Sequence, residues 1–240
     1  MVAIVDYDAG NIRSVEKAVK YLGKDCRLTS DKDEILSADH VILPGVGAFG
    51  DCMDHLKDRH LVEVLKEVKD KDIPFLGICL GLQLLFNDSE ESKGVDGLGI
   101  LSGHIIRFPE RADLKVPHMG WNSIHFPKSG RLFKGIPDGS FVYFVHSYYL
   151  AANDRSIVTA TCDYGNTFDA SVEQGNVFAT QFHPEKSGEV GLQLGALHRA
   201  VAVDGIHFAV VVEEHAEVVD IAFHIDVLPR SAGIIGYEHL

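Results

Sequence analysis

Positively charged residues are scarce in this sequence. It contains 22 lysines and arginines against 35 aspartates and glutamates, which gives a formal net charge of −13 at pH 7. A surface of this sign repels phosphate backbones and anionic lipid headgroups. We therefore expect no nucleic-acid partner and no membrane partner.

Cysteines are also few. The four of them are scattered without a C-x-x-C pair, which argues against both a zinc site and a disulfide framework. Thirteen histidines are present, but none has H-E-x-x-H or comparable ligand spacing. We expect a protein that uses neither a metal nor a cofactor.

Long apolar runs are missing as well. A membrane-spanning helix needs about 18 consecutive apolar residues, whereas the apolar segment 75–86 is short and includes Gln83. The sequence begins with strand-like residues 2–5 and shows neither the basic segment nor the cleavage site of a secretory signal, so we expect no such signal. Because 46% of the 240 residues are hydrophobic, we expect one sizeable globular domain in the cytoplasm.

Apolar runs alternate with helix-period segments through the first ninety residues, as is typical of βα units around a parallel sheet. The run at 74–78 is continuously apolar, which indicates a central strand buried on both faces. The pattern predicts strands at 2–5, 26–29, 40–43 and 74–78, and helices at 11–22, 31–36, 56–68 and 80–86.

From about residue 99 the pattern changes to strands and turns. It predicts strands at 100–108, 121–126, 141–150, 157–161, 168–173 and 177–182. Residues 173–176 form a hairpin-turn signal, since Gly175 and Asn176 tolerate positive φ. The predicted fold class is α/β: a central, mostly parallel sheet flanked by helices, with an added antiparallel strand layer.

The last part of the chain differs in composition. Residues 195–240 contain no Lys, Asn, Gln, Thr or Cys. We therefore predict a catalytic domain over residues 1–199 and an atypical tail over 200–240. Two hypotheses for the tail stay open: a shifted reading frame or read-through, and a lineage-specific extension used in assembly.

A nucleophile motif stands where the central strand meets a helix. Gly77-Ile78-Cys79-Leu80-Gly81 has the form of the G-x-S-x-G elbow, with cysteine as the nucleophile. The flanking glycines allow close approach of strand and helix, and the helix N-terminus favours the thiolate. The Leu80 N–H would point toward a developing oxyanion. The alternative is a buried cysteine between packing glycines.

A candidate base follows the last predicted strand, in Gln181-Phe182-His183-Pro184-Glu185. Positions two apart in extended chain face the same side, so Glu185 can orient the His183 ring and stabilise its charged form. Taken alone, this turn is better explained as a surface loop. Joined to the elbow, it supplies a base and an orienting acid.

A glycine-rich loop at 43–50 ends a parallel strand, and its backbone amides could furnish a second oxyanion donor. No Gly-Lys-Ser/Thr follows, so it is not a phosphate-binding P-loop.

These three pieces, in this order, resemble the class I (triad-type) glutamine amidotransferase family, over residues 1–194. Segments 6–11 (DYDAGN), 115–122 (KVPHMGWN) and 144–149 (FVHSYY) are similar to those of the glutaminase subunits of imidazole glycerol phosphate synthases, in histidine biosynthesis. The resemblance implies a flavodoxin-like sheet. It also implies that Cys79 forms a glutamyl thioester, while His183, oriented by Glu185, moves protons.

The resemblance further implies which residues bind glutamine and form the oxyanion hole: Val46, Gly47, Leu80, Gln83, His146, Ser147 and Tyr148. Val46 or Gly47 would reorient to complete the hole.

By the same resemblance, ammonia passes to a cyclase barrel that makes imidazole glycerol phosphate and an aminoimidazole carboxamide ribotide. A (β/α)₈ barrel takes about 250 residues, so a second polypeptide would supply it as the partner in a heterodimer. The implied partner-facing residues are Asn11, Pro117, Met119, Trp121 and Lys186. For Trp121, core packing is an equal alternative.

Three other functions stay open from the sequence. The chain could supply ammonia to anthranilate, carbamoyl phosphate or guanylate synthesis, although the segment containing Trp121 argues against that. It could hydrolyse γ-glutamyl bonds without a partner, or be a regulatory binding module that has lost catalysis.

Overall fold

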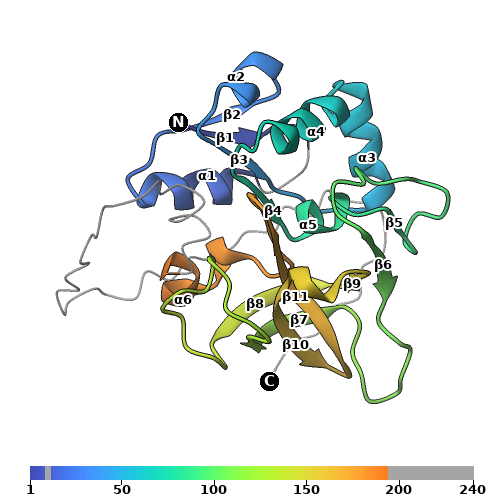
Figure 1. Cartoon of the computed structure of the whole chain (residues 1–240). Helices are drawn as coiled ribbons and strands as arrows, with labels where there is room; N and C mark the ends of the chain where they lie inside the picture. The colour runs from blue at the N-terminus through green and yellow to red at the C-terminus, as the bar shows by residue number, and fades with distance from the viewer. Residues whose placement is uncertain (9–11, 194–240) are drawn as a thin grey trace, which may run out of the picture. The chain divides into compact units, whose positions relative to one another are not determined.

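The computed structural model describes residues 1–8 and 12–193. Its centre is a parallel sheet with the strand order β2 (Cys26–Thr29), β1 (Val2–Val5), β3 (His40–Leu43), β4 (Phe75–Ile78) and β12 (Val177–Thr180) (Figure 1). With β12 as the fifth strand, this is the 2-1-3-4-5 order of flavodoxin-like sheets. The predicted fold class is confirmed.

Antiparallel strands continue the same sheet beyond β12. They run in the order β11 (Asn166–Gln174), β10 (Val158–Tyr164), β7 (His118–His125) and β8 (Phe141–His146). A branch at β11 adds β9 (Tyr148–Ala152), β6 (Gly103–Arg107) and the short β5 (Asp88–Ser89). The predicted hairpin turn joins β11 to β12, and Gly175 there has φ +57°.

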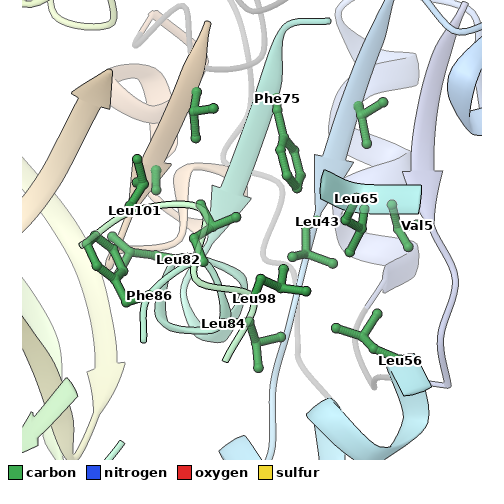
Figure 2. Packing of buried hydrophobic residues seen from close by; sticks show 14 of the residues in the cluster. Val5, Leu43, Leu56, Leu65, Phe75, Leu82, Leu84, Phe86, Leu98 and Leu101 are labelled. Carbon is green, nitrogen blue, oxygen red and sulfur yellow. The ribbon is translucent and has the colours of Figure 1, made fainter. Parts of the chain in front are cut away.

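One face of the parallel strands is covered by α2 (Lys32–Leu36), α3 (Phe49–Asp58) and α4 (Val62–Asp70). Val5, Leu43 and Phe75 gather there with Leu56 and Leu65 of the helices, and all five are fully buried (Figure 2). This burial holds the strands and helices in register through the hydrophobic effect.

The opposite face carries α1 (Ile12–Tyr21) and part of the buried side chains of the antiparallel half. Val2 and Ile4 alternate with the residues of the first core, as the two-residue period of a strand requires. Val15 and Val19 of α1 pack against them. Cys79 belongs to this second core, so the nucleophile motif lies where both halves of the sheet meet.

Four short elements complete the described chain. The helix α5 (Leu80–Leu84) follows β4, and α6 (Gly188–Gln193) ends the described part. Two 3₁₀ turns, η1 (Arg155–Ile157) and η2 (Pro184–Lys186), precede β10 and follow β12 respectively.

Several element predictions were wrong in detail. β6 begins at Gly103, three residues after its predicted start, and β10 ends at Tyr164, three residues after its predicted end. The single helix expected over 56–68 is two helices, because His60 adopts a left-handed φ of +57° between α3 and α4. The strand expected over 141–150 is interrupted at Ser147, since β8 pairs with β7 whereas β9 pairs with β6. β7 begins at His118, three residues before its predicted start.

Asn11 and residues 194–240 lie outside the described residues, so the predicted division into 1–199 and 200–240 stays a prediction. Across the described ranges, no helix is both long and apolar enough to cross a membrane.

Candidate active site

The cysteine elbow begins where β4 ends. Cys79 has φ 56° and ψ −109° and stands at the N-cap of α5. Its N–H donates to the Thr180 carbonyl at 2.8 Å, which ties the elbow to the end of β12. A non-glycine residue held there costs about 1–3 kcal/mol, and such strain concentrates at functional sites.

The two glycines of the elbow are required by close contact. A Cβ at Gly81 would lie 1.9 Å from the Leu43 carbonyl oxygen, and one at Gly77 would lie 2.8 Å from the Gly81 carbonyl oxygen. Any larger residue would push α5 away from β3 and β4.

The histidine–glutamate pair is formed in the structure. His183 Nδ1 lies 2.8 Å from Glu185 Oε1, and the two side chains are 2% and 1% exposed. A carboxylate oxygen can only accept, so Nδ1 carries the proton and Nε2 is left for chemistry. The His183 backbone is held by three hydrogen bonds: its N–H donates to the Tyr143 carbonyl, and its carbonyl accepts from the Ser187 hydroxyl and the Lys186 N–H.

Charge favours the protonated His183 ring. Burial lowers the pKa of His183, but the nearby Cys79 thiolate and the Glu185 carboxylate raise it, to about 10 in balance. Nε2 has no partner at hydrogen-bond geometry within the described residues, so the sulfur acts on the ring through its charge and proximity. The charges around the ring therefore favour the imidazolium form of His183.

Cys79 and His183 open onto one cavity of about 310 Å³. All seven residues predicted to bind glutamine or the oxyanion line it, and Glu91, Pro117 and Val145 complete its wall. Glu91 was not predicted, because no local motif marks it, and Val145 lies in the quoted segment 144–149 but was given no role. The Glu91 carboxylate is held at the cavity by a hydrogen bond of 2.8 Å, which it accepts from the Phe49 N–H at the start of α3.

The glycine-rich loop faces the elbow across this cavity. Gly47 has φ +114°, which favours glycine. The Leu80 N–H donates to the Gly45 carbonyl at 3.3 Å, so the amide predicted to bind an oxyanion is engaged with the loop. The buried Tyr7 hydroxyl supports the loop by donating to the Pro44 carbonyl at 2.7 Å.

Two histidines lie in contact at the cavity wall, where His146 lines the cavity and His118 lies behind it. His146 Nδ1 lies 2.8 Å from the Tyr148 carbonyl, and His146 Nε2 lies 3.1 Å from Nδ1 of His118. Burial lowers the pKa of His146 to about 3 and that of His118 to about 4, so both rings are neutral. Both nitrogens of His146 thus have protein partners, and the ring supports the cavity wall.

The residues predicted to face a partner lie in different places in the structure. Met119 and Trp121 are 62% and 55% exposed on β7, so the core-packing interpretation of Trp121 was wrong. Lys186 lies over the Tyr143 ring at 5.9 Å. Pro117 lines the cavity instead.

The exposed side chains form a continuous apolar face on the β7–β8 pair. Met119 stands opposite Val145, Trp121 opposite Tyr143, and Ser123 opposite the 57% exposed Phe141. Residues two apart on a strand share a face, so Met119, Trp121, Phe141 and Tyr143 lie together. We call these four residues the apolar face.

Comparison with known proteins identifies the class. The profile of the glutamine amidotransferase class-I family matches residues 3–193, and the chain belongs to this family. The imidazole glycerol phosphate synthase subunit HisH of Bacillus cereus (strain G9842) is 56% identical over 194 residues, covering 81% of this chain and 91% of that protein. Subunits of the same name from Moorella thermoacetica and Methanocaldococcus jannaschii are 51% and 48% identical, covering 80% and 81% of this chain and 91% and 96% of theirs.

Solved structures agree on the fold at lower identity. A crystal structure of a glutamine amidotransferase superposes with a TM-score of 0.66 at 19% identity, covering 83% of this chain and 99% of that one. The glutaminase domain of Trypanosoma brucei CTPS gives 0.59 at 17% identity, covering 84% and 95%.

Proposed function

We propose that this chain is the glutaminase subunit of an imidazole glycerol phosphate synthase and acts in histidine biosynthesis. It hydrolyses glutamine to glutamate and ammonia. The observation that carries the proposal is the strained Cys79 elbow facing the His183–Glu185 pair across one cavity. The similarity to HisH subunits over four-fifths of the chain supports the pathway.

The geometry supports a thioester mechanism. The Cys79 thiolate attacks the side-chain carbonyl carbon of glutamine, and the imidazolium of His183 protonates the departing ammonia through Nε2. Neutral His183 then takes a proton from water, which hydrolyses the thioester and releases glutamate with the thiolate restored. Glu185 holds Nδ1 and stabilises each imidazolium state.

Completing the oxyanion hole requires a movement of the loop. The Leu80 N–H must leave the Gly45 carbonyl to reach an oxyanion, and the Val46–Gly47 amides are the candidate second donor. One such donor is worth about 10²- to 10³-fold in rate. The loop therefore provides a means by which a partner controls hydrolysis.

The proposed partner is a cyclase barrel that receives the ammonia and makes imidazole glycerol phosphate and an aminoimidazole carboxamide ribotide. The apolar face suits such a partner, since exposed aromatic and methionine side chains are enriched at protein interfaces. We also propose a cytoplasmic location, because all four cysteines are free and a thiol nucleophile persists in a reducing compartment.

A glutaminase assay with and without the cyclase subunit tests the function. We expect little ammonia from the isolated chain and a large increase when the cyclase subunit and its ligand are added. Full activity of the chain alone would indicate a partner-independent γ-glutamyl hydrolase. No activity in either case would indicate a regulatory module, and activation only by another synthase would indicate another pathway.

The variant Cys79→Ala separates the two half-reactions of the complex. Glutamine-dependent synthesis should be abolished, while synthesis from added ammonium continues because it bypasses the thiol. Loss of both would show that Cys79 is not the glutaminase nucleophile.

A further inference from the structure

A buried glutamine stands behind the nucleophile and has no role in the mechanism above. Gln181 follows β12 directly, is 0% exposed, and places its side-chain nitrogen Nε2 at 3.8 Å from Cys79 Sγ. It is not among the residues that line the cavity. It therefore contacts the sulfur from the protein interior, on a side that substrate does not reach.

The orientation of the Gln181 amide is fixed by a backbone carbonyl. The Tyr148 carbonyl can only accept, so the Gln83 side chain must turn its nitrogen toward it, at 3.1 Å. The same nitrogen lies 3.1 Å from the Gln181 side-chain oxygen, which accepts from it. A flipped Gln83 would set its oxygen against the Tyr148 carbonyl oxygen, and a flipped Gln181 would set its NH₂ group against the NH₂ group of Gln83. The NH₂ group of Gln181 is consequently the end that faces the sulfur.

This arrangement favours the charged sulfur. A hydrogen bond to a charged acceptor is stronger than one to a neutral acceptor, and burial strengthens it further. The Gln181 backbone is also held, because its N–H donates to the Ala170 carbonyl at 2.9 Å. The donor is thus fixed at both ends before substrate arrives.

We propose that Gln181 is a positioning residue of the glutaminase reaction, whose side-chain amide donates to the Cys79 thiolate and holds the sulfur in place for attack. The expected effect of Gln181 on catalysis rests on the proposed function. Its expected effect on the Cys79 thiol does not.

Two variants test the donor. Gln181→Met removes it at similar volume. Gln181→Glu keeps the shape and the oxygen that accepts from Gln83 but places a carboxylate oxygen at the sulfur. If the first variant fails to fold, the second carries the test. The matched control is Gln174→Glu, at the exposed end of β11.

The first measurement is the rate of alkylation of Cys79 by iodoacetamide as a function of pH in the full chain, with the labelled cysteine identified by peptide mass analysis. We expect the midpoint of the pH dependence to rise by about 1–2 pH units in Gln181→Met. The rise should be larger in Gln181→Glu and absent in the control. No variant replaces any of the other titratable residues around the sulfur and the cavity: His183, Glu185, Tyr7, His146, Tyr148 and Glu91.

The second measurement is steady-state kinetics in the complex with the cyclase subunit. We expect kcat for glutamine to fall about tenfold or more near pH 7 in Gln181→Met, with KM changed less than about twofold and partial recovery at higher pH. Ammonium-dependent synthesis should be unchanged.

Two outcomes would overturn the proposal. An unshifted alkylation midpoint in both variants would show that Gln181 does not stabilise the thiolate. A raised KM at constant kcat would make it a substrate-binding residue. If instead the wild-type complex lacked glutaminase activity while the alkylation shift was present, the proposed function would fail and the contact with the thiolate would stand.

Discussion

At the scale of single residues, the Glu185 side chain is buried against one hydrogen-bond partner. It is 1% exposed, and its single hydrogen bond among the described residues is to His183. A buried carboxylate so placed offsets its desolvation chiefly by stabilising the imidazolium beside it.

Replacing Glu185 with Gln should therefore impair proton transfer while leaving the shape of the site intact. We expect kcat for glutamine in the complex to fall roughly 10²- to 10⁴-fold, with ammonium-dependent synthesis unchanged. The matched control is Glu189→Gln, an exposed carboxylate on α6. A loss below about fivefold would assign the orientation of His183 to its backbone bonds instead.

Gly81 allows a prediction about stability at the same scale. A Cβ there meets the Leu43 carbonyl at 1.9 Å, a contact with backbone that cannot rotate away. We expect Gly81→Ala to lower the free energy of unfolding by about 3 kcal/mol or more, measured by urea denaturation. Gly175→Ala serves as the comparison, since it meets no atom within 4 Å and carries only the strain of φ +57°, about 1–2 kcal/mol. Equal losses would contradict the close-contact explanation.

The sequence was sufficient to predict the candidate catalytic residues that stand in short motifs. Cys79 lies between its two glycines, and Glu185 lies two positions after His183, so short motifs were sufficient. Gln181 and Glu91 acquire their places only through tertiary contacts with Cys79 and with α3. No local pattern marks Glu91, and although Gln181 begins the segment that contains His183 and Glu185, the segment does not reveal its contact with the sulfur.

At the scale of elements, the neutral histidine pair joins β7 to β8 inside the protein. His118 and His146 occupy opposite positions in this strand pair and are 3% and 6% exposed. The Tyr148 carbonyl fixes the proton of His146 on Nδ1, so Nε2 accepts from Nδ1 of His118. Protonating either ring would break this pattern.

Stability should consequently fall as the medium becomes acidic. The pKa of each ring is lowered in the folded state, to about 4 and about 3, from about 6.5 in the unfolded chain. Between about pH 6.5 and 4 the unfolded chain binds more protons, so its free energy drops relative to the folded state. From pH 7.5 to 5.5 we expect a loss of about 3 kcal/mol from the pair, measured by urea unfolding.

The double variant His118→Gln, His146→Gln should flatten that dependence. The variant His104→Gln, which changes an exposed histidine paired with Asp88, should retain it. A pH dependence that survives in the double variant would place its origin elsewhere.

Element boundaries show where sequence patterns lose information. Apolar spacing continues across residues 59–61 and did not reveal the left-handed turn at His60 that separates α3 from α4. Likewise, the residues around Ser147 are uniformly strand-forming, and the change of pairing partner between β8 and β9 is a tertiary event. The predicted ends of the strands at 2–5, 26–29 and 40–43 were correct to the residue, because turn-forming residues flank these short strands.

At the scale of the whole molecule, the apolar face is the feature that bears on assembly. We expect Trp121→Ala to weaken binding of the cyclase subunit about 30-fold or more, as for a central aromatic interface residue. The free energy of unfolding of the isolated chain should change by less than about 0.5 kcal/mol, since the side chain is 55% exposed.

Isothermal titration calorimetry with the cyclase subunit measures this change. The control is Tyr21→Ala, which also removes an exposed aromatic side chain. Tyr21 is 77% exposed and lies at the end of α1, outside the apolar face. If both variants bind like wild type, the apolar face serves another contact.

At this scale, the sequence predicted only part of the strand order of the sheet. Alternating strands and helices predicted the parallel half, but the position of β12 between β4 and β11 depends on pairing across a hundred residues. That pairing brings His183 beside Cys79. The resemblance to a known family anticipated it, and spacing alone could not.

The bond between the His183 N–H and the Tyr143 carbonyl has a thermodynamic consequence. Tyr143 belongs to the apolar face, so the strand that carries the proposed partner surface also supports the His183 backbone. If docking of the cyclase subunit shifts β8 and thereby improves the geometry for glutamine, linkage requires the reverse effect as well. Glutamine must then tighten the complex by the same factor by which the complex tightens glutamine.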